Sequence, residues 1–218
     1  MLSITNHKSY RNQNQQRNYK EYFSHNRILE KSRFKYRPIF NNHMKSILVT
    51  GITGSGKSAV CDELKKRGYR AYDIEIMEGL FNLVDNKTGE IVNDYDNENL
   101  EWVKRHDWAC NRKKLQGIVR KNAKGTAFYC GTAGNLDELL FLFDKIFLLK
   151  VSSNILRKRL STRKSNDYGR TSEVQDWIIE WKDWWENHMI ENGAIVIDAD
   201  RGIKEVTIDI LERSKDSE

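Results

Sequence analysis

The segment from Gly51 to Ser58 has the residue types and spacing of a phosphate-binding loop. It reads Gly-Ile-Thr-Gly-Ser-Gly-Lys-Ser, and its glycines let the backbone curl so that successive N–H groups face phosphate oxygens. We expect Lys57 to reach the β- and γ-phosphates of a purine nucleoside triphosphate, and the Ser58 hydroxyl to bind Mg²⁺. The predicted nucleotide-binding residues of this loop are Gly51, Thr53, Gly54, Ser55, Gly56, Lys57 and Ser58.

A second group of candidate residues follows the next apolar segment, at 69–72. Asp73 and Glu75 come directly after it, and ligands gather at the carboxyl ends of parallel strands. Phosphoryl transfer needs one carboxylate for the metal's water shell and another to orient the acceptor hydroxyl. Both acids are therefore candidate catalytic residues, and Asp73 is also a candidate metal ligand. The alternative is a pair of surface acids at the start of a helix.

Four arginines surround the segment 165–169, where a mobile lid is expected: Arg157, Arg159, Arg163 and Arg170. Planar guanidinium groups suit phosphate binding, so Arg163 and Arg170 are the candidate catalytic arginines. The alternative is a solvated basic helix. The last strand runs into the loop 198–202, which could wrap adenine with its backbone, and Ala199 is the candidate residue there. The alternative is an ordinary strand-to-helix connection capped by Asp.

The third strand ends in Cys130 and Gly131, where a motor-type ATPase would carry an acid. This departure argues against that class. The small residues after this strand would let substrate approach the backbone, and Asn135 would cap the turn that follows. On the helix expected at 171–191, tryptophans recur at helical spacing. They indicate core packing first and a substrate wall second.

From residue 44 onward, apolar strands alternate with helices, which predicts a parallel sheet covered on both faces. The expected strands are 46–50, 69–72, 126–130, 145–151 and 194–197. The expected helices are 57–67, 74–84, 98–122, 135–143, 154–163, 171–191 and 203–213, with a turn or hairpin in 85–96.

The net charge of +6 comes from the first 43 residues, which carry +7, whereas residues 44–218 carry −1. We interpret 1–43 as a basic, mostly disordered extension and 44–218 as one domain. A nucleic-acid-binding arm is the alternative interpretation of the extension. Three widely spaced cysteines favour a reducing, cytoplasmic setting, and no apolar run is long enough to predict a membrane partner.

Together these motifs resemble the shikimate, gluconate and nucleoside-monophosphate kinase group. They are also similar to small proteins described only as P-loop or AAA-family ATPases. The resemblance covers about residues 45–213 and includes Tyr72–Glu75, His106–Trp108, Cys130–Asn135, Arg163–Gly169 and Val196–Asp198. It implies that Asp73 holds the metal's water and that Glu75 contacts the acceptor. Shikimate kinases commonly have Asp at the second acid and three glycines after the third strand, so shikimate itself is not expected.

We therefore expect a three-layer α/β P-loop NTPase sandwich with five parallel strands in the order 2-3-1-4-5. The acceptor region would be about 74–125 and the lid about 157–172. The expected reaction moves the γ-phosphoryl group of ATP, with Mg²⁺, to a nucleoside, nucleotide or sugar-type acceptor. The alternative is a regulatory ATPase with slow hydrolysis. A small-molecule acceptor is the expected partner, nucleic acid is not, and the protein would be a monomer or homodimer.

Overall fold

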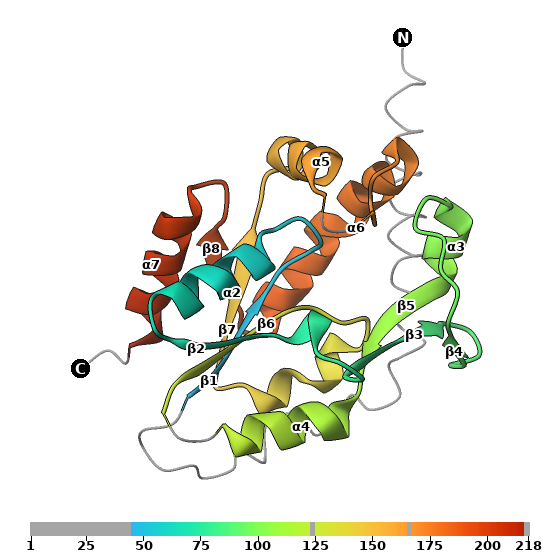
Figure 1. The fold of residues 1–218 in the computed structure, drawn as a ribbon. Coiled ribbons are helices and arrows are strands. Elements are labelled where there is room, and N and C mark those ends of the chain that lie inside the picture. Colours follow the sequence, from blue (N-terminus) through green and yellow to red (C-terminus); the bar gives the residue numbers. More distant parts are fainter. Residues whose placement is uncertain (1–44, 123–124, 165–166, 216–218) are drawn as a thin grey trace.

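A five-stranded parallel sheet forms the centre of the molecule. The computed structural model describes residues 45–122, 125–164 and 167–215, so the expected extension 1–43 lies outside the described residues. The strands stand in the order β2-β6-β1-β7-β8 (Figure 1). Counted along the chain within this sheet, that order is 2-3-1-4-5, which confirms the expected fold class. The strands are β1 (Ser46–Thr50), β2 (Arg70–Asp73), β6 (Ala127–Cys130), β7 (Lys145–Lys150) and β8 (Ile195–Asp198).

The central strands are buried on both faces. Ile47, Leu48 and Val49 of β1 have no exposed surface, and all four residues of β6 are buried. Helices provide this cover: α2 (Lys57–Lys66) and α7 (Ile203–Ser214) lie together on one face, and α6 (Ser172–Glu191) lies on the other (Figure 1). The short helix α5 (Ser153–Thr162) follows β7. This layering places the carboxyl ends of all five strands at one edge.

The region between β2 and β6 differs from the expectation. The helix expected over 74–84 does not form, and 98–122 is largely helical as expected but is divided by a strand. The strands of this region form a second, antiparallel sheet in the order β4-β3-β5. Its pairing joins segments about 25 residues apart, from Phe81↔Cys110 to Asp85↔His106. The elements are the 3₁₀ turn Ile74–Ile76, β3 (Phe81–Asp85), β4 (Ile91–Val92), α3 (Leu100–Arg105), β5 (His106–Cys110) and α4 (Arg112–Lys121). The hairpin expected in 85–96 is confirmed.

Two smaller expectations around residue 135 are wrong. The segment 135–143 holds two 3₁₀ turns, Leu136–Glu138 and Leu140–Leu142, instead of a helix. The Asn135 side chain does not cap the first turn. Its amide instead accepts from the Cys110 N–H at 2.9 Å and donates to the Cys110 carbonyl at 3.1 Å. Asn135 therefore ties the loop after β6 to the end of β5. This contact fixes the described segment between β2 and β6, residues 74–122, against the main sheet, and we call this segment the insert.

The tryptophans of α6 pack as the core interpretation predicted. Trp177 and Trp185 are 8% exposed, and Trp181 lies between them in two edge-to-face contacts. One turn apart on the same helix, Lys182 and Glu186 form a buried ion pair of 2.9 Å. Within the described ranges, no helix is long and apolar enough to cross a membrane.

Candidate active site

The loop between β1 and α2 curls tightly under the lid. Gly54 and Gly56 have φ of 78° and 107°, in the left-handed region where other residues are strained. A Cβ at Gly54 would lie 2.9 Å from Leu156 Cδ1, so the loop packs closely against α5. The Ser55 side chain points into this cradle. Its hydroxyl is buried and has no hydrogen-bond partner among the described residues. An orphaned polar atom inside a curled loop fits a site that receives a polar ligand.

Lys57 folds back across this loop. Its ammonium group donates to the carbonyl oxygens of Gly51 and Ile52 at 2.9 and 3.2 Å, and it lies 3.4 Å from Glu75 Oε1. Only 7% of the residue is exposed. The neighbouring Ser58, in the first turn of α2, is exposed. The lysine is thus held at the centre of the loop by oxygen atoms, and its phosphate-binding role stays a prediction.

Asp73, the last residue of β2, and Glu75, two residues later, have different surroundings. Asp73 is buried, and its Oδ1 accepts from the Glu75 N–H at 3.3 Å, which starts the 3₁₀ turn. Glu75 extends toward the loop after β6, where its Oε1 accepts from the Thr132 N–H at 2.8 Å. That same oxygen faces Lys57. Glu75 therefore joins the ends of β2 and β6 to the phosphate loop.

Gly131 makes this arrangement possible. A Cβ there would lie 2.4 Å from Ile74 Cγ1 and 3.2 Å from Glu75 Cγ, both closer than ordinary contacts. The expectation was that a small residue would admit substrate to the backbone. In the structure, the absence of a side chain at Gly131 makes room for the turn that contains Glu75.

One of the two candidate lid arginines reaches the loop. Arg163 Nη1 donates to Thr53 Oγ1 at 2.9 Å, and its Nη2 donates to the Tyr168 carbonyl. Burial lowers the pKa of this guanidinium, while the nearby Tyr168 and Glu75 act in the opposite direction. Arg170 is exposed, and within the described part of the chain no hydrogen bond or ion pair joins it to the loop. Its positive charge is near enough to act on Arg163.

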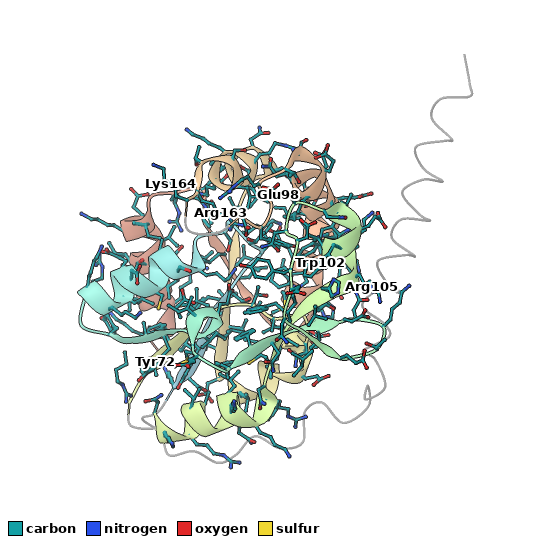
Figure 2. The ribbon with its side chains drawn as sticks, turned by 45° about the vertical axis from the view of Figure 1, so that its right-hand side comes forward. Tyr72, Glu98, Trp102, Arg105, Arg163 and Lys164 are labelled. Atoms are coloured by element: carbon teal, nitrogen blue, oxygen red, sulfur yellow. The ribbon has the colours of Figure 1, made fainter. Side chains whose placement is uncertain are left out.

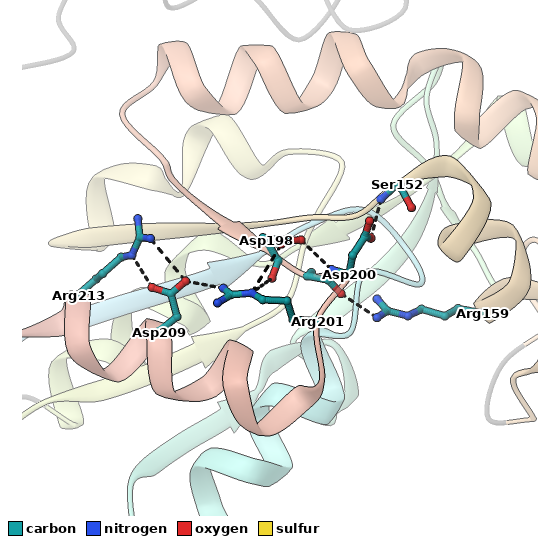
Figure 3. Close-up of polar contacts among 8 residues, drawn as sticks. Ser152, Arg159, Asp198, Asp200, Arg201, Asp209 and Arg213 are labelled. Carbon is teal, nitrogen blue, oxygen red and sulfur yellow. Dashed lines mark hydrogen bonds and ion pairs between the residues drawn. The ribbon is translucent and has the colours of Figure 1, made fainter.

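Arg159 is one of the four arginines noted in the sequence, but it was not chosen as a candidate catalytic residue. Its guanidinium donates to the carbonyls of Ser55 at 3.2 Å and Ala199 at 2.7 Å, bridging the phosphate loop and the loop after β8. Arg159 is in the last turn of α5 and Arg163 directly follows that helix, and both guanidinium groups donate to the phosphate loop. The available signal was the cluster of arginines in this segment. Figure 3 shows Arg159 beside the loop after β8, where Asp200 Oδ1 accepts from the Ser152 N–H at 2.8 Å.

A cavity of about 220 Å³ adjoins this bridge. Ala199, 2% exposed, contributes to its wall, and its nucleotide-binding role stays a prediction. The predicted Asp cap of the following helix is not present, because Gly202 stands at the cap position of α7 and Asp198 Oδ1 accepts from the Asp200 N–H. The other lining residues are Ser55, Gly56, Ala59, Val60, Arg159, Arg201, Ile203 and Val206.

Comparison with known proteins identifies the family and the fold of the chain. The family model described as an AAA domain matches residues 47–180, and the chain belongs to that family. The fold resembles that of a shikimate kinase from Bacteroides thetaiotaomicron, with a TM-score of 0.51 and 15% identity over 78% of this chain and 98% of that chain. This confirms the expected resemblance to P-loop small-molecule kinases in fold.

Two further solved structures align over similar lengths. A deoxyadenosine kinase from M. mycoides with bound dATP has a TM-score of 0.49 and 15% identity, covering 78% of this chain and 98% of that one. A gluconokinase from Sinorhizobium meliloti 1021 has a TM-score of 0.44 and 18% identity, covering 79% and 92%. At 15% identity, the likeness to the shikimate kinase shows the fold alone. No curated protein matches the sequence.

Proposed function

We propose that the protein is an ATP-dependent phosphotransferase that moves the γ-phosphoryl group to a hydroxyl of a small nucleoside-, nucleotide- or sugar-type acceptor. The observation that carries this proposal is the meeting of Lys57, Glu75 and Arg163 at one edge of the sheet. Lys57 lies inside the phosphate loop and 3.4 Å from Glu75 Oε1, while Arg163 is hydrogen-bonded to Thr53 of the same loop. Cations for the phosphates and a carboxylate for the acceptor are thus brought together.

The nucleotide half uses the loop and the cavity beside it. Backbone N–H groups of the loop would hold the phosphates, and Lys57 would exchange the Gly51 and Ile52 carbonyls for phosphate oxygens. The base would occupy the cavity of about 220 Å³ next to Ala199, and the planar Arg159 guanidinium would lie against it.

The donor set at this edge fits Mg²⁺. The described residues contain no group of three His, Cys, Asp or Glu that could hold a metal ion by themselves. Mg²⁺ in such enzymes keeps several waters and takes one or two protein oxygens together with substrate phosphates. Ser58 and Asp73 would supply these oxygens. Bound there, the ion neutralises phosphate charge.

In the transfer step, the acceptor hydroxyl oxygen forms a bond to the γ-phosphorus, and the bond from that phosphorus to the bridging oxygen of ADP breaks. The hydroxyl proton passes to Glu75. Both contacts of Glu75 use Oε1, which leaves Oε2 to accept the hydrogen bond of the hydroxyl. Lys57 and Arg163 stabilise the negative charge on the transferred group. The protein therefore acts through positioning and charge rather than through a covalent intermediate.

The test is ADP formation by the purified protein in the presence of nucleosides, nucleoside monophosphates, sugars and sugar acids. We expect at least one acceptor to raise ATP consumption well above the rate with water. Lys57→Ala should lower that turnover about a hundredfold or more, whereas the matched control Lys66→Ala, an exposed lysine of the same helix, should not. Wild-type turnover in Lys57→Ala would remove the proposal. Hydrolysis that no acceptor accelerates would favour the regulatory ATPase instead.

A further inference from the structure

Asp107, the second residue of β5, lies next to the loop after β6. The Trp108 carbonyl accepts a hydrogen bond from the Gly134 N–H at 2.9 Å, and a Cβ at Gly134 would lie 3.0 Å from Asp107 Cβ and 3.1 Å from its Cγ. Gly134 is three residues after Gly131, which is in the same close contact with Glu75. A three-residue step spans at most about 10 Å. The short segment after β6 therefore runs from the side chain of Glu75 to that of Asp107.

The lid also contacts the insert. Asn97 Nδ2, in the loop before α3, donates to Asp167 Oδ1 of the lid at 2.6 Å. The labelled Glu98 and Arg163 mark these two segments in Figure 2. The lid, which reaches the phosphate loop through Arg163, thus also contacts the insert.

Tyr168 is a residue of the lid. Burial raises the pKa of its phenol, and the negative charge of Asp107 raises it further, while Arg163 opposes the change. The phenol is therefore protonated at neutral pH and can donate a hydrogen bond. Tyr168 is thus near enough to Asp107 for its charge to act on the phenol, and the Tyr168 carbonyl accepts a hydrogen bond from Arg163.

Three described carboxylates, Glu75, Asp107 and Asp167, belong to the segments that meet here. Of the described cations, Lys57 and Arg163 already bind oxygen atoms of the phosphate loop, where the proposed nucleotide needs them, and Arg170 is exposed beside Arg163. An acceptor carrying its own acid group would meet like charges on the insert side, and such contacts are unfavourable.

We propose that Asp107 is an acceptor-binding residue and that the acceptor is an uncharged polyhydroxylated molecule, a nucleoside or sugar, rather than a nucleoside monophosphate or sugar acid. Asp107 accepts a hydrogen bond from an acceptor hydroxyl remote from the one phosphorylated, while Glu75 takes the reacting hydroxyl. A charged hydrogen bond of this kind orients the acceptor and rejects analogues that bring a negative charge to it. This inference rests on the proposed phosphotransferase function.

The test compares matched acceptor pairs, each nucleoside with its monophosphate and each sugar with its acid, by kcat/KM for ADP formation. We expect the wild-type protein to use the uncharged member at least tenfold better. Asp107→Asn should raise the KM for the uncharged acceptor about tenfold, leave the KM for ATP within about twofold, and narrow the preference within each pair. Asp94→Asn, an exposed carboxylate of the same insert, is the matched control and should change nothing.

Equal use of both members, or a preference for the anionic one, would overturn the inference and leave the phosphotransferase function standing. An unchanged preference in Asp107→Asn would likewise show that Asp107 does not select the acceptor. If the protein binds ATP but uses neither member of any pair, both the function and the inference fail. The wild-type comparison decides the matter even if the variant does not fold.

Discussion

Gly131→Ala tests the packing that places Glu75. The new methyl group would lie 2.4 Å from Cγ1 and 3.0 Å from Cδ1 of Ile74, a side chain that is 1% exposed. Neither the β6 backbone nor a buried isoleucine can move away cheaply. Overpacking of this kind costs about 1–3 kcal/mol. For a chain of this size, that lowers the melting temperature by about 2–12 °C.

The assay is thermal or denaturant unfolding of the variant, with two comparisons. Gly117→Ala is the matched control, because a Cβ at that helical glycine meets nothing within 4 Å, and it should raise stability by about 0.5–1 kcal/mol. Ile74→Ala removes the obstructing atoms, so Gly131→Ala should cost much less in that background. The coupling free energy in this double-mutant cycle should be about 1 kcal/mol or more.

Activity adds a second readout of Gly131→Ala. Because Glu75 Cγ is also within 3.2 Å of the new methyl group, the carboxylate should shift and the turnover of acceptor should fall more than ATP affinity. A variant as stable and as active as the wild type would refute the account of why Gly131 is a glycine.

Three further variants test separate parts of the molecule. Asp73→Asn should raise the Mg²⁺ concentration needed for half-maximal activity, measured by Mg²⁺ titration. Glu75→Gln should lower acceptor-dependent turnover about a hundredfold with little change in ATP affinity, measured by steady-state kinetics. Hydrogen bonds from the Lys87 N–H and from Arg105 lower the pKa of Asp85 to about 2 from its ordinary 3.8. The carboxylate therefore stabilises the fold above about pH 4 and loses this effect as the pH falls toward 2. The melting-temperature deficit of Asp85→Asn should shrink over that interval, and a constant deficit would contradict it.

The nucleotide half of the site could be predicted because its signals are local. The loop 51–58 contains its own glycines, its lysine and its helix start, and each strand of the main sheet is a short apolar run between breakers. The acids at the end of β2 followed from one rule about the carboxyl ends of parallel strands. Of the two lid arginines, Arg163 reaches the loop and Arg170 is exposed, a difference that depends on the path of the lid backbone.

The insert was misassigned because its pairing is not local. Apolar residues in 74–84 recur at spacings that suit a helix, yet β3 obtains its hydrogen bonds from β5, which comes about 25 residues later. Two signals were available. Gly79 has a φ of 64° and interrupts the expected helix. Asn99 and Asn111 each accept hydrogen bonds from helix N–H groups, so the expected helix 98–122 is two helices with β5 between them.

This difference between the two halves has a physical basis. A phosphate loop meets the same phosphate oxygens and charges whatever the acceptor, so a contiguous motif can encode it. The proposed acceptor half lies where β5, the loop after β6 and the lid come near one another, and these segments supply Asp107, Gly134 and Tyr168 respectively. The identity of the acceptor depends on the charge and shape of that junction. The sequence alone could therefore predict a phosphate loop, whereas the proposed acceptor class was inferred from the antiparallel sheet that brings Asp107 next to Gly134.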